Sequence, residues 1–174
     1  MRLSPRFTAS AAMFLAIFQM AGSALGAEEM LESRESVYNN IYVLKRGDLV
    51  IMQFGKNQRF WTESIYDSSD PKALPVDYTR YLTAALAYPP KVESVLEIGL
   101  GGGRTASYLD IFMPELSIHS VELDPVVIEM AEEYFDLRPD GNFTVEAVDG
   151  RIHLMRSSAQ HDVILVDAYR GPVV

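Results

Sequence analysis

The stretch that decides the fold is Val95-Leu96-Glu97-Ile98-Gly99-Leu100-Gly101-Gly102-Gly103-Arg104-Thr105. The mostly apolar positions before Gly99 are typical of a parallel strand that is covered on both faces. Gly99, Gly101 and Gly103 then alternate, so the backbone there can adopt positive φ and its N–H groups can approach a ligand. A helix that begins after such a turn adds free N–H donors and partial positive charge. The stretch therefore predicts a strand, a glycine turn and a helix that cradle a nucleotide or nucleoside.

Beyond the glycine turn, short apolar strands alternate with amphipathic helices. We expect helices over residues 105–112, 125–135 and 150–157, and strands over residues 117–122, 142–148 and 162–167. Alternating strands and helices imply right-handed βαβ units and a doubly wound parallel sheet. Residues 76–174 are therefore expected to form a Rossmann-like α/β domain.

Residues 27–75 are expected to form a small β region in front of this domain. The polar residues 28–35 suggest a lead-in segment, and turn signals then separate β-rich runs. We expect an antiparallel meander with strands over residues 37–44, 49–54 and 59–62. A helix over residues 76–88 follows, and Pro89-Pro90 ends it.

Composition excludes several classes of function. The 174 residues contain no cysteine, which excludes disulfides, thiolate metal sites and a cysteine nucleophile. The net charge of −9 argues against a nucleic-acid partner and suits small cationic substrates.

Acidic residues follow three of the predicted strands, where ligands of such sheets bind. Glu122 comes 21 residues after Gly101, a spacing that suits hydrogen bonds to ribose hydroxyls. Asp149 could accept from an adenine amino group while Gly150 admits the ring. The alternatives are a solvated loop carboxylate at Glu122 and an ordinary Asp-Gly turn at Asp149.

The three histidines are His119, His153 and His161. They are scattered along the sequence, and none has a carboxylate at the spacing of metal ligands. We expect His119 and His153 to pack or cap, and we expect no metal site.

Several segments, taken in order, resemble the spermidine synthase (polyamine aminopropyltransferase) family, which is built on the S-adenosylmethionine methyltransferase fold. They are residues 95–105, 121–124, 149–150 and 162–172, together with the upstream residues 36–41 and 78–89. The resemblance implies a Rossmann-like, methyltransferase-type doubly wound sheet behind a small β meander. Such sheets usually have seven strands and four are visible here, so we expect the chain to continue past Val174.

The resemblance also implies a role for each matching residue. The co-substrate would be S-adenosylmethionine or its decarboxylated form, and the partner a small amine or another small acceptor; a homodimer stays open. Asp167 would orient and deprotonate the attacking amine, which is protonated at neutral pH because its pKa is about 10.4. The expected nucleoside-binding residues are Glu97, Gly99, Gly101, Gly103, Glu122, Asp149 and Gly150.

Some positions depart from the family pattern. Arg170 stands where the family has a second acid that binds the diamine, and a cation there should repel a diamine. Glu97 is typical of methyltransferases, in which it supports the methionine amino group. The string Asp67-Ser68-Ser69-Asp70-Pro71 spells the family's catalytic motif, but it precedes the glycine turn and is interpreted as a coincidental turn.

Three functions follow from these residues. Aminopropyl transfer is the leading interpretation. Methyl transfer from S-adenosylmethionine is the first alternative, and a non-catalytic exported nucleoside-binding protein is the second.

Residues 1–26 have the pattern of a secretory signal peptide. Arg2 and Arg6 precede an apolar run over residues 11–21, and Ala24-Leu25-Gly26 offers small residues for cleavage. The alternatives are an uncleaved membrane anchor and a misassigned start codon. We expect export to the periplasm or the medium, with no stable membrane span after cleavage.

We predict cleavage after Gly26 or Ala27, because the small residues lie directly behind the apolar run. Mass spectrometry of exported protein would give the N-terminal residue. A mature protein that keeps Met1 would contradict the prediction.

Overall fold

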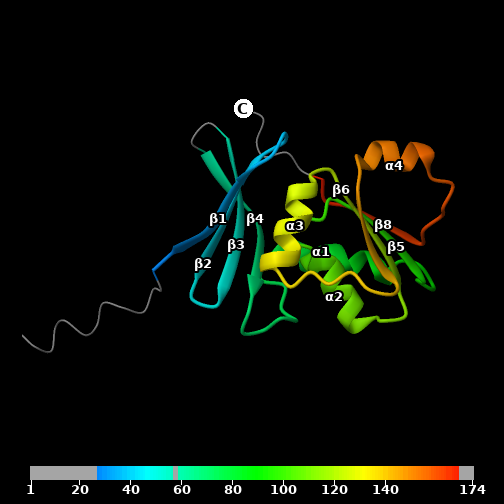
Figure 1. Ribbon diagram of the computed structural model, residues 1–174. Coiled ribbons are helices and arrows are strands. Elements are labelled where there is room, and N and C mark those ends of the chain that lie inside the picture. Colours follow the sequence, from blue (N-terminus) through cyan, green and yellow to red (C-terminus); the bar gives the residue numbers. More distant parts are fainter. Residues whose placement is uncertain (1–26, 57–58, 169–174) are drawn as a thin grey trace, which may run out of the picture.

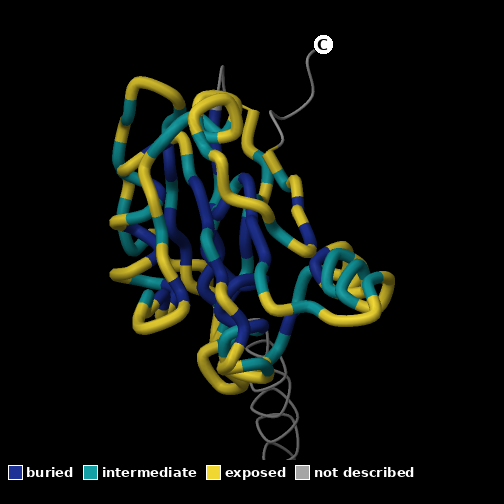
Figure 2. The backbone as a smooth tube through the Cα atoms, turned by 90° about the vertical axis from the view of Figure 1, so that its right-hand side faces the viewer, coloured by how far each residue is buried: buried dark blue, intermediate teal, exposed yellow. Residues whose placement is uncertain are grey.

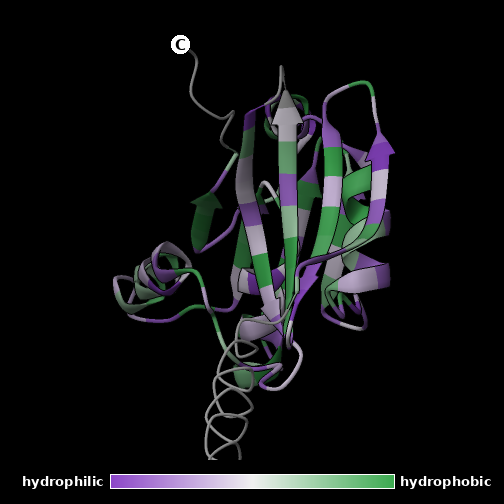
Figure 3. Ribbon diagram, turned by 90° about the vertical axis from the view of Figure 1, so that its left-hand side faces the viewer, coloured by the Kyte–Doolittle hydropathy of each residue, from purple (hydrophilic) through white to green (hydrophobic). Residues whose placement is uncertain are grey.

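The computed structural model describes residues 27–56 and 59–168, and its strands form two four-stranded sheets (Figure 1). The first sheet is an antiparallel meander in the order β1-β2-β3-β4. Its strands are β1 (Glu29–Glu35), β2 (Asn40–Arg46), β3 (Leu49–Lys56) and β4 (Arg59–Asp67). Both polar and apolar residues occur along these strands (Figure 3), as expected for a sheet with one face on a core, although residues 49–52 of β3 are a continuous apolar run. The predicted meander is confirmed, whereas the boundary at residue 75 stays a prediction.

The expectation that residues 28–35 form only a lead-in is wrong. They contain β1, which pairs with β2 from Glu29 opposite Lys45 to Glu35 opposite Asn40. β1 is an edge strand, and edge strands commonly carry charged side chains because these discourage pairing with other molecules. The polarity of the segment therefore marks its place in the sheet and not a lack of structure.

The second sheet is parallel, in the order β7-β6-β5-β8, which is Rossmann-like. Its strands are β5 (Ser94–Ile98), β6 (Ser117–Glu122), β7 (Phe143–Ala147) and β8 (Val163–Val166). The helices are α1 (Asp77–Thr83), the 3₁₀ helix η1 (Ala84–Ala87), α2 (Arg104–Phe112), α3 (Pro125–Tyr134) and α4 (Gly150–Arg156). The predicted α/β fold is confirmed. The helix predicted over residues 76–88 is α-helical only to Thr83, because its last part tightens into η1 before the two prolines.

Alternate residues of each parallel strand face opposite sides of this sheet. Val95 and Ile118 pack in one cluster with Ala106 and Leu109 of α2 and with Ala131 of α3. Leu96, Ile98 and Val121 point to the opposite face of the sheet and form a separate small cluster. Helix α4 lies over this second face (Figure 1), so the sheet has helices on both sides.

Helix α3 joins the two sheets. Its buried Val127 and Met130 pack against Ile41, Val43 and Met52 of the antiparallel sheet. Asp124 caps the helix by accepting a 3.1 Å hydrogen bond from the backbone N–H of Val126. Figure 2 shows the buried backbone running through the strands, with exposed backbone at the turns.

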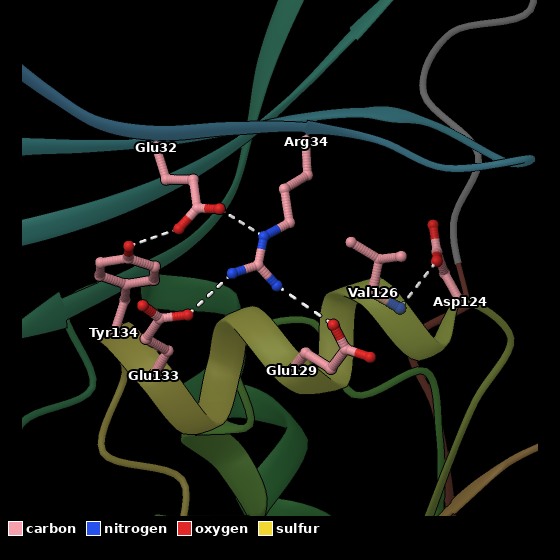
Figure 4. A network of polar contacts seen from close by, with 7 residues as sticks. All are labelled: Glu32, Arg34, Asp124, Val126, Glu129, Glu133 and Tyr134. Atoms are coloured by element: carbon pink, nitrogen blue, oxygen red, sulfur yellow. Dashed lines mark hydrogen bonds and ion pairs between the residues drawn. The ribbon is translucent and has the colours of Figure 1, made fainter.

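A polar network also connects strand β1 of the antiparallel sheet to helix α3, at the edge of the molecule (Figure 4). Arg34 of β1 donates to Glu129 at 3.1 Å and to Glu133 at 2.8 Å, both on α3. Glu32 accepts from Arg34 and from Tyr134. Glu129 and Glu133 are exposed and the other groups are half-buried, so the network orients β1 on α3 and adds only modest stability.

Arg104, at the start of α2, makes a buried connection between the parallel-sheet domain and the antiparallel sheet. Its guanidinium donates to the carbonyl of Phe135 at 2.9 Å and to that of Pro71. It also lies 4.7 Å from the ring centre of Tyr66 in β4, within the range of a cation–π contact. Burial disfavours the charged guanidinium and so lowers the pKa of Arg104. The two carbonyls and the Tyr66 ring offset part of this desolvation cost.

We predict that Arg104→Met destabilises the fold by about 1–3 kcal/mol, because the buried carbonyl of Phe135 loses its donor. Urea denaturation followed by circular dichroism would measure the loss. Arg34→Met is the matched control, and we expect a smaller loss from it because two of its three partners, Glu129 and Glu133, are exposed. An equal loss in both variants would contradict the prediction.

Within residues 27–56 and 59–168, no helix is both long and apolar enough to cross a membrane. The predicted signal peptide, residues 1–26, lies outside the described residues, as does Arg170.

Candidate functional site

The glycine turn has the predicted backbone conformation. The φ angles are +93° at Gly99, +53° at Gly101 and +68° at Gly103. A Cβ at Gly99 would lie 2.6 Å from the backbone oxygen of Asp167, so only glycine lets the ends of β5 and β8 approach this closely. A Cβ at Gly101 would meet nothing nearer than Glu63 Cγ, at 3.7 Å. The turn is therefore tight against the sheet at Gly99 and open at Gly101.

A cavity of about 610 Å³ opens beside this turn, at the carboxyl ends of the parallel strands. It brings together Gly99, Gly101, Glu122, Asp149, Gly150 and Asp167 from the sequence-predicted set. Glu97 and Gly103 do not line it. Gly103 is the N-cap of α2, and Glu97 is a buried residue of β5.

Glu122 lies at the end of β6 and contacts the glycine turn directly. Its Oε2 accepts from the backbone N–H groups of Leu100 at 2.9 Å and of Gly101 at 3.3 Å. A carboxylate has about four lone-pair positions, so these bonds leave room for a ligand hydroxyl. The ribose assignment stays a prediction, but the same side chain also fixes the turn.

Asp149 caps α4 by accepting a 2.9 Å hydrogen bond from Arg151 N–H, and its carboxylate also pairs with the Arg151 guanidinium. These bonds lower the pKa of Asp149 to about 2. A Cβ at Gly150 would lie 2.4 Å from Ile98 Cγ2, so this glycine lets α4 begin against the sheet. Asp149 and Gly150 therefore begin α4 and do not form the ordinary turn considered from the sequence. Binding of adenine here stays a prediction.

Glu97 is almost completely buried on β5. Burial raises its pKa to about 8, although the Ser120 hydroxyl donates to it at 2.6 Å. A carboxyl group with this pKa is mostly protonated at neutral pH. Any support that it gives to a ligand amino group therefore depends on its losing that proton.

Asp167 follows β8 and faces the cavity. Tyr78 of α1 donates its phenolic O–H to Asp167 Oδ2 at 2.8 Å. Burial raises the pKa of Asp167, and this hydrogen bond partly opposes the rise. The pKa of Tyr78 is raised by burial and by the neighbouring carboxylate, so the phenol stays protonated and remains a donor.

Sequence reasoning missed Glu63, which lines the cavity from β4. Burial and the nearby Asp167 and Glu122 raise its pKa to about 7. The sequence analysis ended this strand at residue 62, so Glu63 lay beyond the predicted strand, and the sequence does not indicate that it meets the glycine turn. That contact depends on Gly102, where a Cβ would lie 2.5 Å from Ser64 Oγ.

The string at Asp67 is a turn, as predicted. Asp67 Oδ1 accepts from the backbone N–H of Ser69 at 2.9 Å. None of its residues lines the cavity.

The expectation that no histidine has a carboxylate partner is wrong. Glu146 Oε2 lies 3.4 Å from His119 Nε2 and 3.1 Å from His153 Nδ1. These residues come from β6, β7 and α4, so the sheet register and the βα connection bring them together. Their spacing along the chain gave no sign of it.

Comparisons with known proteins agree with this geometry. A polyamine aminopropyltransferase of Vibrio vulnificus (strain CMCP6) is 34% identical over 156 residues, which is 87% of this chain and 52% of that protein. The chain thus spans about half the length of this relative. No family model matches the sequence.

Solved structures show the same fold. A probable spermidine synthase from Corynebacterium glutamicum ATCC 13032 has a TM-score of 0.68 at 20% identity, covering 82% of this chain and 53% of that one. Human methyltransferase-like protein 13 in complex with SAH has a TM-score of 0.51 at 24% identity, covering 57% of this chain and 50% of that one.

The strand order and the likeness to solved structures give the chain a Rossmann-like fold of the methyltransferase type. Within that class the chain is spermidine synthase-like, which confirms the resemblance found in the sequence.

We predict that Glu63 makes stability depend on pH. The folded protein keeps the Glu63 proton up to about pH 7, whereas the unfolded chain loses it near its ordinary pKa of 4.5. The folded state therefore binds more protons in this window, so its stability falls as pH rises from about 4.5 to about 7. Glu63→Gln should remove about 1–2 kcal/mol of that fall, allowing for solvent screening of this partly exposed group.

Urea denaturation at about pH 5 and at about pH 8 would measure the change in unfolding free energy. Glu132→Gln, an exposed substitution on α3, is the control and should leave the pH dependence as it is. The same loss of stability with pH in Glu63→Gln and in wild type would contradict the assignment.

Proposed function

We propose that the protein binds S-adenosylmethionine or its decarboxylated form in the 610 Å³ cavity, and that it transfers the aminopropyl group of the decarboxylated form to an amine. The observation that carries the proposal is the pair formed by Asp167 and Tyr78 at the end of β8, opposite Glu63 of β4. The name of the Vibrio vulnificus relative, a polyamine aminopropyltransferase, supports the same activity.

The nucleoside half of the proposed site is the edge formed by the glycine turn, Glu122 and Asp149. The open space over Gly101 admits a ligand close to the backbone. Glu122 accepts hydrogen bonds from ribose hydroxyls while it also holds the turn. The bound co-substrate supplies a sulfonium-activated carbon.

The acceptor half is acidic, which suits an amine that arrives protonated. Asp167 binds the amine nitrogen and takes up a proton as the new C–N bond forms and the C–S bond breaks. The Tyr78 hydroxyl holds the Asp167 carboxylate in place. Glu63, whose pKa is about 7, is ionised in part near neutral pH and adds negative charge to this end of the cavity.

Methyl transfer is a second candidate, and Glu97 favours it. This acid before the glycine turn is typical of methyltransferases, and it is buried next to the site. The fold likeness to the human methyltransferase-like protein agrees with either reaction. Export is a further proposal, and it rests on residues 1–26 alone.

We predict that Asp167→Asn lowers turnover by about 10²–10⁴-fold, because the amide cannot take up the proton. Nucleoside binding should stay nearly unchanged, since Asp167 belongs to the acceptor half. Chromatography of the nucleoside product after incubation with either co-substrate would measure turnover. Methylthioadenosine is the expected product, and S-adenosylhomocysteine would favour methyl transfer instead.

Glu122→Ala is the complementary variant. It should weaken methylthioadenosine binding by about 1.5–3 kcal/mol, the range for hydrogen bonds to a charged group, as measured by calorimetry. Unchanged affinity in folded Glu122→Ala would remove the ribose assignment. Binding without either product would support the non-catalytic nucleoside-binding alternative.

A further inference from the structure

A second cluster of chemical groups lies on the α4 side of the parallel sheet. It consists of His119 on β6, Glu146 on β7 and His153 on α4. None of these residues lines the cavity that contains Asp167. The proposed transfer reaction gives the cluster no role.

The spacing of the three side chains suits coordination of one ion. One ligand atom from each residue lies within 4.8 Å of the others. Glu146 Oε2 is 3.4 Å from His119 Nε2 and 3.1 Å from His153 Nδ1. Ligand atoms about 2.1 Å from a tetrahedral zinc ion lie about 3.4 Å apart. Both measured separations are close to this value.

The hydrogen bonds of His119 determine which of its nitrogens is free. The Thr144 hydroxyl lies 3.4 Å from the carbonyl oxygen of Ile118, to which it donates. The same hydroxyl oxygen lies 2.8 Å from His119 Nδ1, and in the tautomer that carries the proton on Nδ1 it accepts from Nδ1–H. In a neutral ring, Nε2 then carries the lone pair and points at Glu146.

In this neutral tautomer the Nε2 lone pair and the Glu146 carboxylate oxygen repel each other, and either a metal ion between them or a proton on Nε2 removes the repulsion. The Thr144 hydroxyl also matches the usual partner of a metal-bound histidine, whose second nitrogen donates to an oxygen atom. We propose that His119, Glu146 and His153 bind one divalent transition-metal ion of the zinc class. Two imidazoles and one carboxylate make an open zinc site, in which water completes the coordination.

His161 lies at the edge of the cluster and shares a surface pocket with His153. Its Nδ1 is buried and has no hydrogen-bond partner among the described residues, and the same is true of His153 Nε2. These unpaired nitrogens show that the polar groups here are incompletely satisfied by the protein. His161 is not one of the three residues whose ligand atoms meet, so water remains the expected fourth ligand.

The test is zinc binding by the purified wild-type protein after chelator treatment. Equilibrium dialysis with metal analysis should give one zinc ion per chain. His119→Gln and Glu146→Gln should each weaken binding by more than about 10-fold, because each removes a ligand. Thr144→Val should weaken it by about 10–100-fold, because it removes only the partner of Nδ1–H.

Two controls make the result specific. Glu115→Gln changes an exposed acid elsewhere and should leave zinc binding as it is. Asp167→Asn should also leave it unchanged, which separates this site from the proposed reaction. Circular dichroism would verify that each variant is folded.

Cobalt(II) substitution gives an independent reading, since its visible spectrum reports ligand number and geometry. A tetrahedral spectrum that is lost in Glu146→Gln is expected. Wild-type protein that binds no stoichiometric zinc would overturn the proposal. So would zinc binding that survives in His119→Gln, Glu146→Gln and Thr144→Val, because histidine–carboxylate ion pairing would then account for the cluster.

Discussion

The structure depends on close backbone approach at the glycine turn. At Gly99 a side chain would collide with the Asp167 backbone, and at Gly102 with Ser64 of β4. The first contact lets strands β5 and β8 end together, and the second brings the antiparallel sheet against the parallel one. Glu122 then locks the turn through two backbone N–H groups. Removal of these contacts would separate the acidic residues that share the cavity.

The parallel sheet could be predicted from the sequence because each of its signals is local. Apolar runs, the glycine turn and the acids at strand ends lie within a few residues of the elements that they define. Asp167 was predicted in this way, and the structure places it in the cavity. The edge strand β1 was missed because its charges match those of a solvated segment.

Other features could not be predicted because they join elements distant in sequence. Glu63 enters the cavity only after β4 packs on the turn, and Tyr78 reaches Asp167 across 89 positions of sequence. The histidine and glutamate cluster likewise depends on the register between β6 and β7. Residue type shows what such groups can do, whereas packing decides whether they meet.

The two ends of the cavity are formed by different sheets of the molecule. Glu122 and Asp149 follow strands of the parallel sheet, whereas Glu63 comes from the antiparallel meander. Under the proposed function, substitutions in the meander can therefore change which acceptor is selected without altering the residues proposed to hold the nucleoside. For the proposed reaction, such a division lets new substrate preferences arise on an unchanged donor site, with the small β region acting as an exchangeable specificity module.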